Sequence, residues 1–328
     1  MTVSIRSLGR LAAALFGVAA LASASLSCAQ DKWPSRPVRI IVPASAGGAS
    51  DVVARMLSTR LAEVLGQPFV VDNHAGAGGV IGAQLVAQAA PDGYTMLMSF
   101  DSFTINSFLF KNVPDPLRDF APVTQVCLLP QVFLVHPGLK VKTLKDFVLL
   151  AKAKRTQLNY GSAGPASSSR LAFELFEDVA GIDVVAVHYK GGGPAIQALL
   201  SGQVQAMLVQ GGGTIQQNVK AGKLVALAVS TAAPSPLHPG LPTIAASYPG
   251  FETQSWVGLV APAKTPRPLI DRLNATIAKI VAEPAMKEQF TQQGAEIVAG
   301  SPEAMTKLMR DEQGKWSRLI QKRKISVD

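Results

Sequence analysis

Short apolar segments alternate with amphipathic segments along most of this chain. Residues 38–42 and 69–71 are apolar and rich in β-branched side chains, which is typical of strands. Between them, at residues 52–65, apolar positions recur every three or four residues and form one stripe. This pattern predicts a helix that ends at Gly66. A second helix is predicted at residues 80–90, before the turn Pro-Asp-Gly.

The same alternation continues to the end of the chain. Thr143 and Asp146 have the spacing of a capping box, which predicts a helix at residues 144–153. Ser301 before Pro302 predicts the start of a helical C-terminal tail. Further strands are predicted at residues 94–98, 158–160, 184–187, 206–209 and 225–229. Strands that alternate with helices predict an α/β fold with mainly parallel sheets.

Two stretches rich in proline and turn residues interrupt the alternation, at residues 115–122 and 234–249. We expect the chain to cross between two domains near them, within residues 124–134 and 232–255. About 300 residues is long for one hydrophobic core and suits two domains. The sequence therefore predicts two Rossmann-like α/β domains joined by a hinge. The first would comprise residues 30–130 plus 250–328, with both ends of the mature chain, and the second residues 131–249.

The N-terminal segment, residues 1–29, has the composition of a secretory signal peptide. Arg6 and Arg10 come first, an uncharged apolar run follows, and small residues lead up to Ala29. The apolar run is short for a membrane span of about 20 residues. We expect cleavage after Ala29, with Ala24 as the alternative, and delivery of the mature chain to the periplasm.

Charge and cysteine content narrow the function classes. The net charge of +9 falls to +7 without the signal peptide, because that segment holds two arginines and no acid. The basic residues are spread along the chain rather than clustered, which argues against nucleic-acid binding. Cys127 would be the one cysteine left, in an apolar run typical of a buried strand, so no internal disulfide is expected. We expect a monomer.

Glycine- and serine-rich loops follow three of the predicted strands, at residues 43–51, 160–169 and 189–194. A helix that starts after such a loop presents unpaired N–H groups and a partial positive charge, so each loop is a candidate anion site. Ordinary turns between strands and helices are the alternative. The three loops are expected at the carboxyl edge of parallel strands, where ligands of α/β folds bind.

Motifs for catalysis and for cofactors are missing from the sequence. It contains no Gly-x-x-x-x-Gly-Lys-Ser/Thr, no Gly-x-Ser-x-Gly and no His-Glu-x-x-His. Residues 76–82 have the glycines of a dinucleotide fingerprint but not its last spacing. The four histidines, at positions 74, 136, 188 and 238, lack metal-ligand spacing. The sequence therefore predicts a protein without enzymatic activity, cofactor or metal.

Eight segments, taken in order, resemble the receptors of tripartite tricarboxylate transporters, the Bug family. The first is Trp-Pro-Ser-Arg-Pro-Val-Arg-Ile-Ile-Val-Pro at residues 33–43, followed by the Gly-Gly loop to Asp51. The others are residues 73–79, 90–95, 119–123, 158–162, 189–191, 221–224 and 256–262. The resemblance implies a type II periplasmic binding protein fold, in which two domains close around a small ligand.

The same resemblance implies where a ligand carboxylate would be held. Backbone groups of the first loop and of the second-domain loop bind it in that family, often through water. Carried onto this chain, these positions are Ser45, Ala46, Gly48, Ser50 and Asp51, together with Ser162, Ala163 and Ser167. The loop at residues 99–106, with Ser99, Asp101 and Ser102, would face the ligand's far end, where Phe100 and Phe103 add apolar area. Gln210 completes the candidate binding residues.

Several of these positions depart from the family pattern. Pro165 removes one N–H from the second loop, and Arg170 replaces a frequent histidine. Gln205 and Gln210 stand at frequent aspartate positions, and Asp101 stands where small or hydroxyl residues are common. Asp101 could receive an amine or a hydroxyl group, and Arg170 could pair with a second acid. Solvated loop charges are the alternative for both.

The sequence thus predicts an extracytoplasmic receptor that captures a small carboxylated solute for the membrane subunits of a tripartite tricarboxylate transporter. A sensor protein that docks on the ectodomain of a histidine kinase would have the same sequence features. An exported α/β enzyme is a third reading, but it requires a nucleophile or an acid–base pair that the sequence does not show.

Overall fold

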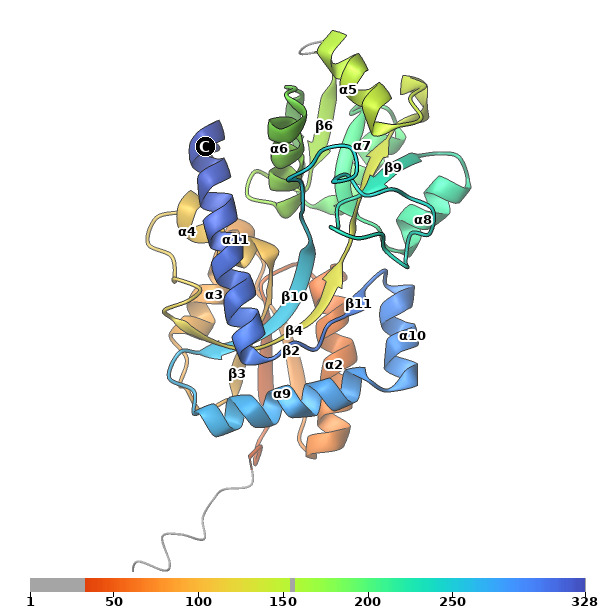
Figure 1. Ribbon diagram of the computed structural model, residues 1–328. Coiled ribbons are helices and arrows are strands. Elements are labelled where there is room, and N and C mark those ends of the chain that lie inside the picture. The colour runs from red at the N-terminus through yellow and green to blue at the C-terminus, as the bar shows by residue number, and fades with distance from the viewer. Residues whose placement is uncertain (1–32, 154–156, 328) are drawn as a thin grey trace, which may run out of the picture.

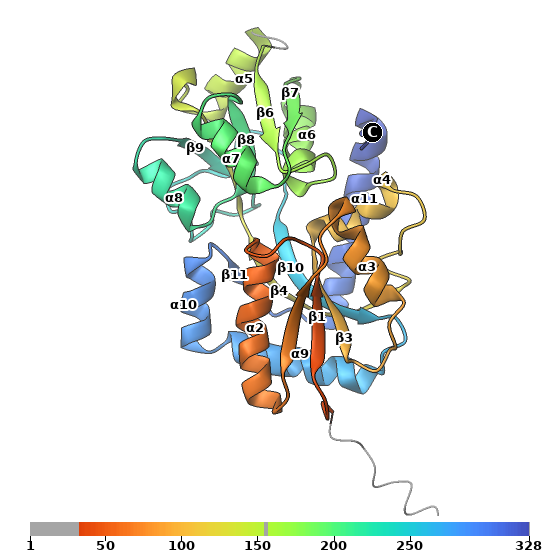
Figure 2. The ribbon, with the colours of Figure 1, turned by 180° about the vertical axis from the view of Figure 1, so that it is seen from behind.

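The computed structural model describes residues 33–153 and 157–327, so the predicted signal peptide lies outside the described residues. These residues form two α/β lobes, one above the other (Figure 1, and from behind in Figure 2). Domain 1 is built on a six-stranded sheet and domain 2 on a five-stranded sheet. The predicted two-domain α/β fold is confirmed.

Domain 1 has the sheet order β11-β4-β10-β3-β1-β2. Its strands are β1 (Val38–Val42), β2 (Phe69–Asn73), β3 (Thr95–Phe100), β4 (Phe120–Leu129), β10 (Ser255–Pro262) and β11 (Glu296–Ile297). Its helices are α2 (Ala49–Leu65), α3 (Val80–Ala87), α4 (Asn106–Leu109), α9 (Arg267–Val281) and α10 (Pro284–Gln292), with short turns η1 (Ala77–Gly79) and η2 (Asp101–Thr104). The apolar stripe predicted for α2 packs on the sheet through Val53, Leu57 and Leu61, all buried.

Domain 2 has the sheet order β7-β6-β8-β5-β9. Its strands are β5 (Gln131–Val135), β6 (Asn159–Ser162), β7 (Val185–His188), β8 (Ala206–Gln210) and β9 (Val225–Val229). Its helices are α5 (Leu144–Ala153), α6 (Ser168–Ala180), α7 (Gly192–Leu200) and α8 (Gly213–Lys220), with the turn η3 (Pro137–Leu139). An aromatic cluster fills its core, with the Tyr160 ring stacked 3.9 Å from that of Phe173.

Most predicted helices and strands are present within a few residues of their expected limits. The helix at Leu144–Ala153 has the predicted bounds, and Thr143 and Asp146 form the predicted reciprocal cap. Cys127 lies fully buried in β4, as its apolar run indicates. The expectation of mainly parallel sheets is wrong in part. In domain 1, β10 runs antiparallel to β3 and β4, and in domain 2, β5 runs antiparallel to β8 and β9.

The antiparallel strands belong to the segments that connect the domains. The chain leaves the first sheet at the end of β4, passes Pro130 and enters the second sheet as β5. It returns through residues 230–254 into β10. These two connections are tied together, because the Ser230 hydroxyl accepts the N–H of Gln131 at 3.1 Å and donates to the Thr253 carbonyl at 2.8 Å. The paired connections form a short hinge between the sheets.

A third connection is the long C-terminal helix α11 (Pro302–Arg323), which runs along both lobes in Figure 1. Its N-terminal half packs on domain 1 through Met305 and Met309. Its C-terminal half packs on α6 of domain 2, where Trp316, Leu319 and Leu171 share one cluster. The helix therefore bridges the domains on the side of β4 and α6.

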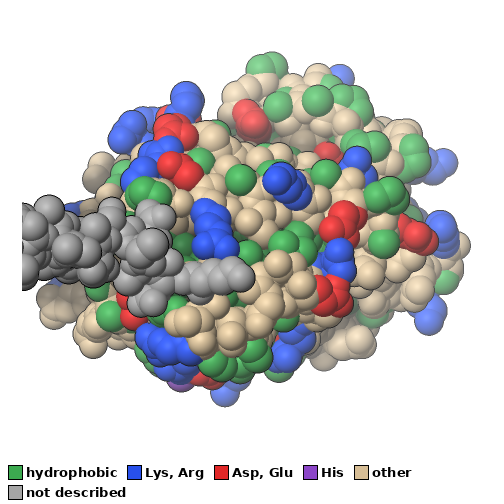
Figure 3. Space-filling view, turned by 90° about the horizontal axis from the view of Figure 1, so that it is seen from below, with side chains coloured by type: hydrophobic (Ala, Val, Ile, Leu, Met, Phe, Trp, Pro, Cys, Tyr) green, Lys and Arg blue, Asp and Glu red, His purple; other side chains and the backbone are tan. Residues whose placement is uncertain are grey.

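The molecular surface carries mixed charge on the face drawn in Figure 3, where lysine and arginine side chains alternate with acidic ones. Across residues 33–153 and 157–327, no helix combines the length and the apolar character that crossing a membrane requires.

Candidate functional site

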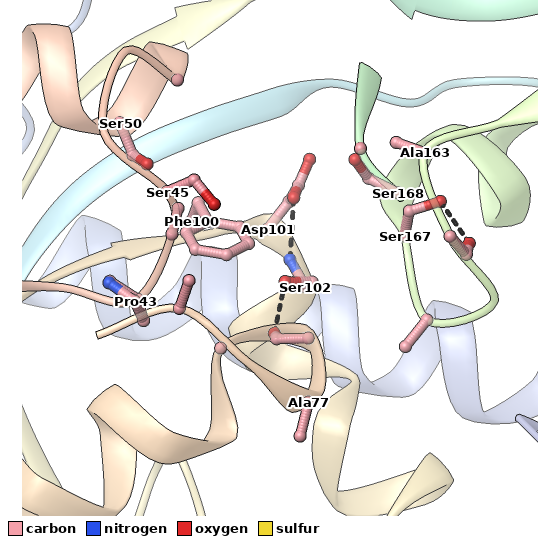
Figure 4. Close-up of a pocket in the computed structure, with 18 of the residues that line it drawn as sticks. Pro43, Ser45, Ser50, Ala77, Phe100, Asp101, Ser102, Ala163, Ser167 and Ser168 are labelled. Carbon is pink, nitrogen blue, oxygen red and sulfur yellow. Dashed lines mark hydrogen bonds between the residues drawn. The ribbon is translucent and has the colours of Figure 1, made fainter. Parts of the chain in front are cut away.

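A cleft of about 780 Å³ lies between the two domains. From domain 1 it is lined by Pro43, Ala44, Ser45, Gly48, Ala49, Ser50, Ala75, Gly76, Ala77, Gly78, Gly79, Phe100, Asp101, Ser102, Phe110 and Val257. From domain 2 it is lined by Ala163, Gly164, Pro165, Ala166, Ser167, Ser168, Tyr189, Lys190, Gly191 and Gln210, and Val327 completes it from the C-terminal segment. Figure 4 shows Asp101 between Ser45 and Ser50 on one side and Ser167 and Ser168 on the other.

Strand direction explains why these segments meet. The strands β1 and β3 are parallel, and both end at the cleft, followed by Pro43 and by Asp101. In domain 2, β6 and β8 are parallel, and they end at the cleft with Ala163 following β6 and Gln210 closing β8. The carboxyl edges of two parallel sheet regions therefore face each other, which is where ligands of open α/β sheets bind.

The first loop of domain 1 exposes the start of helix α2 to the cleft. Gly48 is the N-cap residue, and no side chain caps the helix. The Asp51 carboxylate instead accepts the Gly47 N–H at 2.9 Å and contacts Arg55 and Asn73 at 3.0 Å each. These bonds hold the pKa of Asp51 below its usual range although burial opposes them. The first N–H groups of α2 are left for an acceptor in the cleft.

A second glycine-rich segment, Gly76 to Gly79, lies beside this loop. Gly76, Gly78 and Gly79 have φ of 140°, 64° and 98°, a region in which side chains are strained. The Gly78 carbonyl accepts the hydroxyl of Ser102 at 3.2 Å and the amide of Asn106 at 3.0 Å. A Cβ on Gly78 would lie 3.3 Å from the Cβ of Ala166, so the two domains approach closely here.

The facing loop of domain 2 is organised by its own hydroxyl groups. The Ala163 N–H donates to the Ser169 hydroxyl at 2.9 Å, and the Ser167 hydroxyl donates to the Gly164 carbonyl at 2.7 Å. Ser167 also caps α6 by accepting the N–H of Arg170. The Ala163 N–H is therefore already engaged, and a ligand on this side meets chiefly the Ser167 and Ser168 side of the helix start.

The floor of the cleft holds a polar chain that links the domains. Gln210 of β8 donates to the Ser255 hydroxyl at 3.0 Å, and that hydroxyl donates to the Asp101 carboxylate. The Ser102 N–H also donates to Asp101, at 2.7 Å. Asp101 is 6% exposed, and burial raises its pKa to about 6, although hydroxyl groups of Ser255 and Ser168 oppose the rise.

Eight of the twelve candidate binding residues line the cleft: Ser45, Gly48, Ser50, Asp101, Ser102, Ala163, Ser167 and Gln210. The other four do not. Ala46 is exposed outside it, Asp51 shapes the first loop, and the buried Ser99 hydroxyl donates to the Gly258 carbonyl at 3.1 Å. Ser162 is buried, with its hydroxyl 2.7 Å from Nδ1 of His188. Three of these four side chains are used to hold the loops in place.

Two further expectations for the ligand's far end are wrong. Arg170 is engaged by the protein, because its guanidinium donates to the carbonyl oxygens of Pro165 at 2.9 Å and Ser326 at 2.6 Å. It does not line the cleft and so is not placed to pair with a second acid. Phe103 also points away, with its ring 4.9 Å from that of Phe120 in the core. Phe100 does line the cleft.

Some cleft residues were not among the candidates. Two glycine-rich segments contribute such residues, Gly76 to Gly79 and Tyr189 to Gly191. Their glycine content could have identified them as candidates from the sequence. Val257 and Val327 carry no local signal, because they reach the cleft through the return strand β10 and the end of the C-terminal helix.

The cleft presents polar groups that can hydrogen-bond a small molecule. Its lining offers hydroxyl groups, one amide, backbone N–H groups and two charged side chains. Among the residues that the structure describes, no group of histidine, cysteine or acidic side chains could hold a metal ion. Cys127 lies fully buried in β4, where burial raises the pKa of its thiol to about 12. Ser162 and His188 are close to each other, but neither lines the cleft.

Comparison with known proteins identifies consistent relatives. Residues 53–325 match the family described as the tripartite tricarboxylate transporter family receptor. The chain is 35% identical over 308 residues to the protein BugT of Bordetella pertussis, covering 93% of this chain and 92% of BugT.

Solved structures agree with this result. Rhodopseudomonas palustris Rpa4515 with adipate superimposes with a TM-score of 0.81 at 33% identity, covering 90% of this chain and 99% of that one. MatC from the same species, with bound malate, superimposes with a TM-score of 0.76 at 31% identity, covering 88% and 100%. Both similarities extend over the two domains and the cleft between them.

Proposed function

This chain belongs to the tripartite tricarboxylate transporter receptor family, with Bug-type relatives, and we propose that its interdomain cleft binds a small carboxylate. Receptors of this family are solute-binding proteins of the periplasm. The solute would be delivered to the membrane subunits of a tripartite tricarboxylate transporter by a receptor that acts as a monomer. Residues 1–29 would direct export and be removed.

The observation that carries the proposal is the uncapped start of α2, which faces a cleft between two domains. A helix start combines unpaired N–H groups with a partial positive charge, and so it favours an anion. Hydrogen bonds to a carboxylate contribute roughly 1.5–3 kcal/mol each. Three of them approach the roughly 8 kcal/mol of a micromolar complex.

The proposed carboxylate position lies between Ser45, Gly48 and Ser50 of domain 1 and Ser167 of domain 2. Ser102 and Gln210 would contact the remainder of the ligand. The adipate and malate of the two similar structures are both small carboxylates, which supports a small carboxylate as the ligand here. The cleft of about 780 Å³ has room for such a molecule with water around it.

Thermal denaturation of the mature protein, stripped of bound ligand, tests the proposal. The panel consists of aliphatic and aromatic mono- and dicarboxylates. A bound ligand at 100 times its Kd adds about 2.7 kcal/mol, which corresponds to roughly 5 °C in the melting temperature of a protein of this size. The neutral amides of the same acids serve as controls and should have no effect. A folded protein whose melting temperature no carboxylate raises would contradict the proposal.

A further inference from the structure

The cleft contains two charged side chains of opposite sign. Among the described lining residues, Asp101 is the one acid and Lys190 the one base. They come from different domains, since Asp101 follows β3 and Lys190 precedes α7. A site built only for a dicarboxylate has no evident use for an acid, because two like charges repel in a poorly solvated space.

Asp101 has hydrogen-bond donors but no cationic partner. Its carboxylate contacts the hydroxyl groups of Ser255 and Ser168 and the Ser102 N–H, which are all neutral. It forms no ion pair with any residue in 33–153 or 157–327. The charged group that acts on it is Glu312 of α11, which repels it and is itself paired with Lys315 at 2.5 Å. A buried carboxylate left in this state is costly unless a counter-charge arrives.

The position of Asp101 lets a ligand supply that counter-charge. The carboxyl group points into the space between the two facing loops in Figure 4. The start of α2 lies on one side of it and the serines of the α6 loop on the other. A ligand held by its carboxylate at α2 would therefore have its remaining atoms close to Asp101.

Lys190 lies on the opposite wall and remains exposed. No acidic side chain within the described part of the chain pairs with it. Its ammonium group, together with the start of α2, favours the negative end of a ligand that enters the cleft. The cleft thus combines groups that favour a negative charge, Lys190 and the start of α2, with one acid, Asp101, that favours a positive charge.

From this arrangement we infer that the ligand carries a cationic nitrogen as well as a carboxylate, with the nitrogen bound by Asp101. This inference rests on the proposed carboxylate site and defines the ligand class within it. An ammonium or iminium group would donate to the Asp101 carboxylate in a charge-assisted bond. Asp101 then serves as the residue that distinguishes zwitterions from simple acids.

A purely structural role for Asp101 makes a different prediction. Asp101, Ser255 and Gln210 form one hydrogen-bonded chain at the hinge. If Asp101 only held this chain together, removal of Ser255 would affect ligand choice in the same way as removal of the charge. Ser255 does not line the cleft, so its substitution by alanine is a matched control.

The experiment measures the affinity of the mature protein for pairs of compounds that differ only in the nitrogen. Suitable pairs are glutamate with glutarate, aminohexanoate with hexanoate, and piperidine carboxylate with cyclohexane carboxylate. We expect the nitrogen-containing member of the pair that fits to bind roughly ten- to hundredfold more tightly. The comparison is made at pH 8, where Asp101 stays ionised even without the Ser255 donor: Asp101→Asn should remove this preference, while Ser255→Ala should retain it.

A second measurement uses the unmodified protein and so does not depend on how the variants fold. Between about pH 6 and pH 8 the ligands keep almost all of their charge, and Asp101 changes from about half ionised to almost fully ionised. Glu312, Ser102, Ser168 and Ser255 are the groups that face it, and Glu312 is paired with Lys315. Affinity for the nitrogen-containing compound should rise with pH, and affinity for its partner should fall.

The outcomes distinguish failure of the nitrogen contact at Asp101 from failure of the carboxylate site. If the nitrogen-free members bind equally well or better, the inference is overturned while the carboxylate site stands. If Ser255→Ala abolishes the preference at pH 8 as Asp101→Asn does, or if affinity for the nitrogen-containing member does not rise with pH, Asp101 does not bind the nitrogen. If no member of any pair binds to folded protein, the proposed function fails, and the inference fails with it.

Discussion

At the scale of single residues, Asp101 is held by hydroxyl groups in a place where an ion pair would be expected. The folded protein raises the pKa of this carboxyl to about 6, from an ordinary value of 3.8, chiefly through burial. The folded state therefore binds the proton more tightly than the unfolded state. It follows that the contribution of Asp101 to stability without ligand falls as the pH rises from about 4 to about 7.

Replacing Asp101 with asparagine should remove this pH dependence. We expect the asparagine variant to gain in stability relative to the native protein as the pH is raised from about 4 to about 7, by up to roughly 3 kcal/mol. Urea denaturation of both ligand-free proteins at several pH values measures the difference. A difference that stays constant across this range, or that changes in the opposite direction, would show that the carboxyl is not perturbed by burial.

Individual residues of the site were only partly predictable from the sequence. The loops were recognisable by their glycines and serines, and eight of the twelve candidates line the cleft. Asp51, Ser99 and Ser162 have side chains of the right chemistry in the right loops. However, their side chains form hydrogen bonds within the protein: Asp51 with Gly47, Ser99 with Gly258 and Ser162 with His188. A one-dimensional pattern gives the loop but not the direction in which each side chain points.

At the scale of elements, the C-terminal helix α11 contributes more to the interdomain structure than its sequence indicates. Its last residue, Arg323, donates to Glu174 at 2.5 Å and to Glu177 at 2.8 Å, both on α6 of domain 2. Glu174 and Glu177 are 8% and 2% exposed. The helix starts in domain 1, so these bonds attach one domain to the other.

Removal of the Arg323 side chain should destabilise the protein by about 2–4 kcal/mol, because it leaves the buried Glu177 without an ion-pair partner and Glu174 with Arg170 alone. The neighbouring pair of Lys322 with Asp178 is more exposed, at 66% for the lysine side chain, and serves as the control. Lys322→Ala should cost less than about 1 kcal/mol. Equal effects of Arg323→Ala and Lys322→Ala in denaturant titrations would contradict the proposed attachment.

Elements with strong local signals were predictable, and elements defined by long-range pairing were not. Helix α5 has its predicted bounds because its cap and its apolar stripe are both local. Strand β10 pairs antiparallel with β3, which ends at residue 100, and β5 pairs antiparallel with β9. Hydrophobic runs show that a strand exists but do not give its neighbours or its direction. The strand pairing on either side of the hinge therefore could not be predicted from the sequence.

At the scale of the whole molecule, two sheets present their carboxyl edges to one cleft, and the connections between them lie on one side of it. The hydrogen bonds among Gln131, Ser230 and Thr253 hold the two hinge segments together. A ligand bound by loops of both domains would stabilise their approach, which is already close where Gly78 faces Ala166. The number of domains could be predicted from length and pattern, while the third connection through α11 could not.

In the proposed complex, the start of α2 holds the ligand's carboxylate. Gly48 tests this most directly, because an aspartate there would suit the N-cap position and leave the helix stable. The carboxylate of the new aspartate would then accept hydrogen bonds from the N–H groups at the start of α2, and it would repel the carboxylate of the ligand.

The decisive measurement is the calorimetric affinity of Gly48→Asp for a carboxylate that stabilises the native protein. Ala46→Asp serves as the control, since it adds the same charge to the same loop at an exposed position outside the cleft. We expect Gly48→Asp to lose roughly a hundredfold or more in affinity, with its free energy of unfolding unchanged, and Ala46→Asp to change little. Native affinity in a folded Gly48→Asp protein would contradict it.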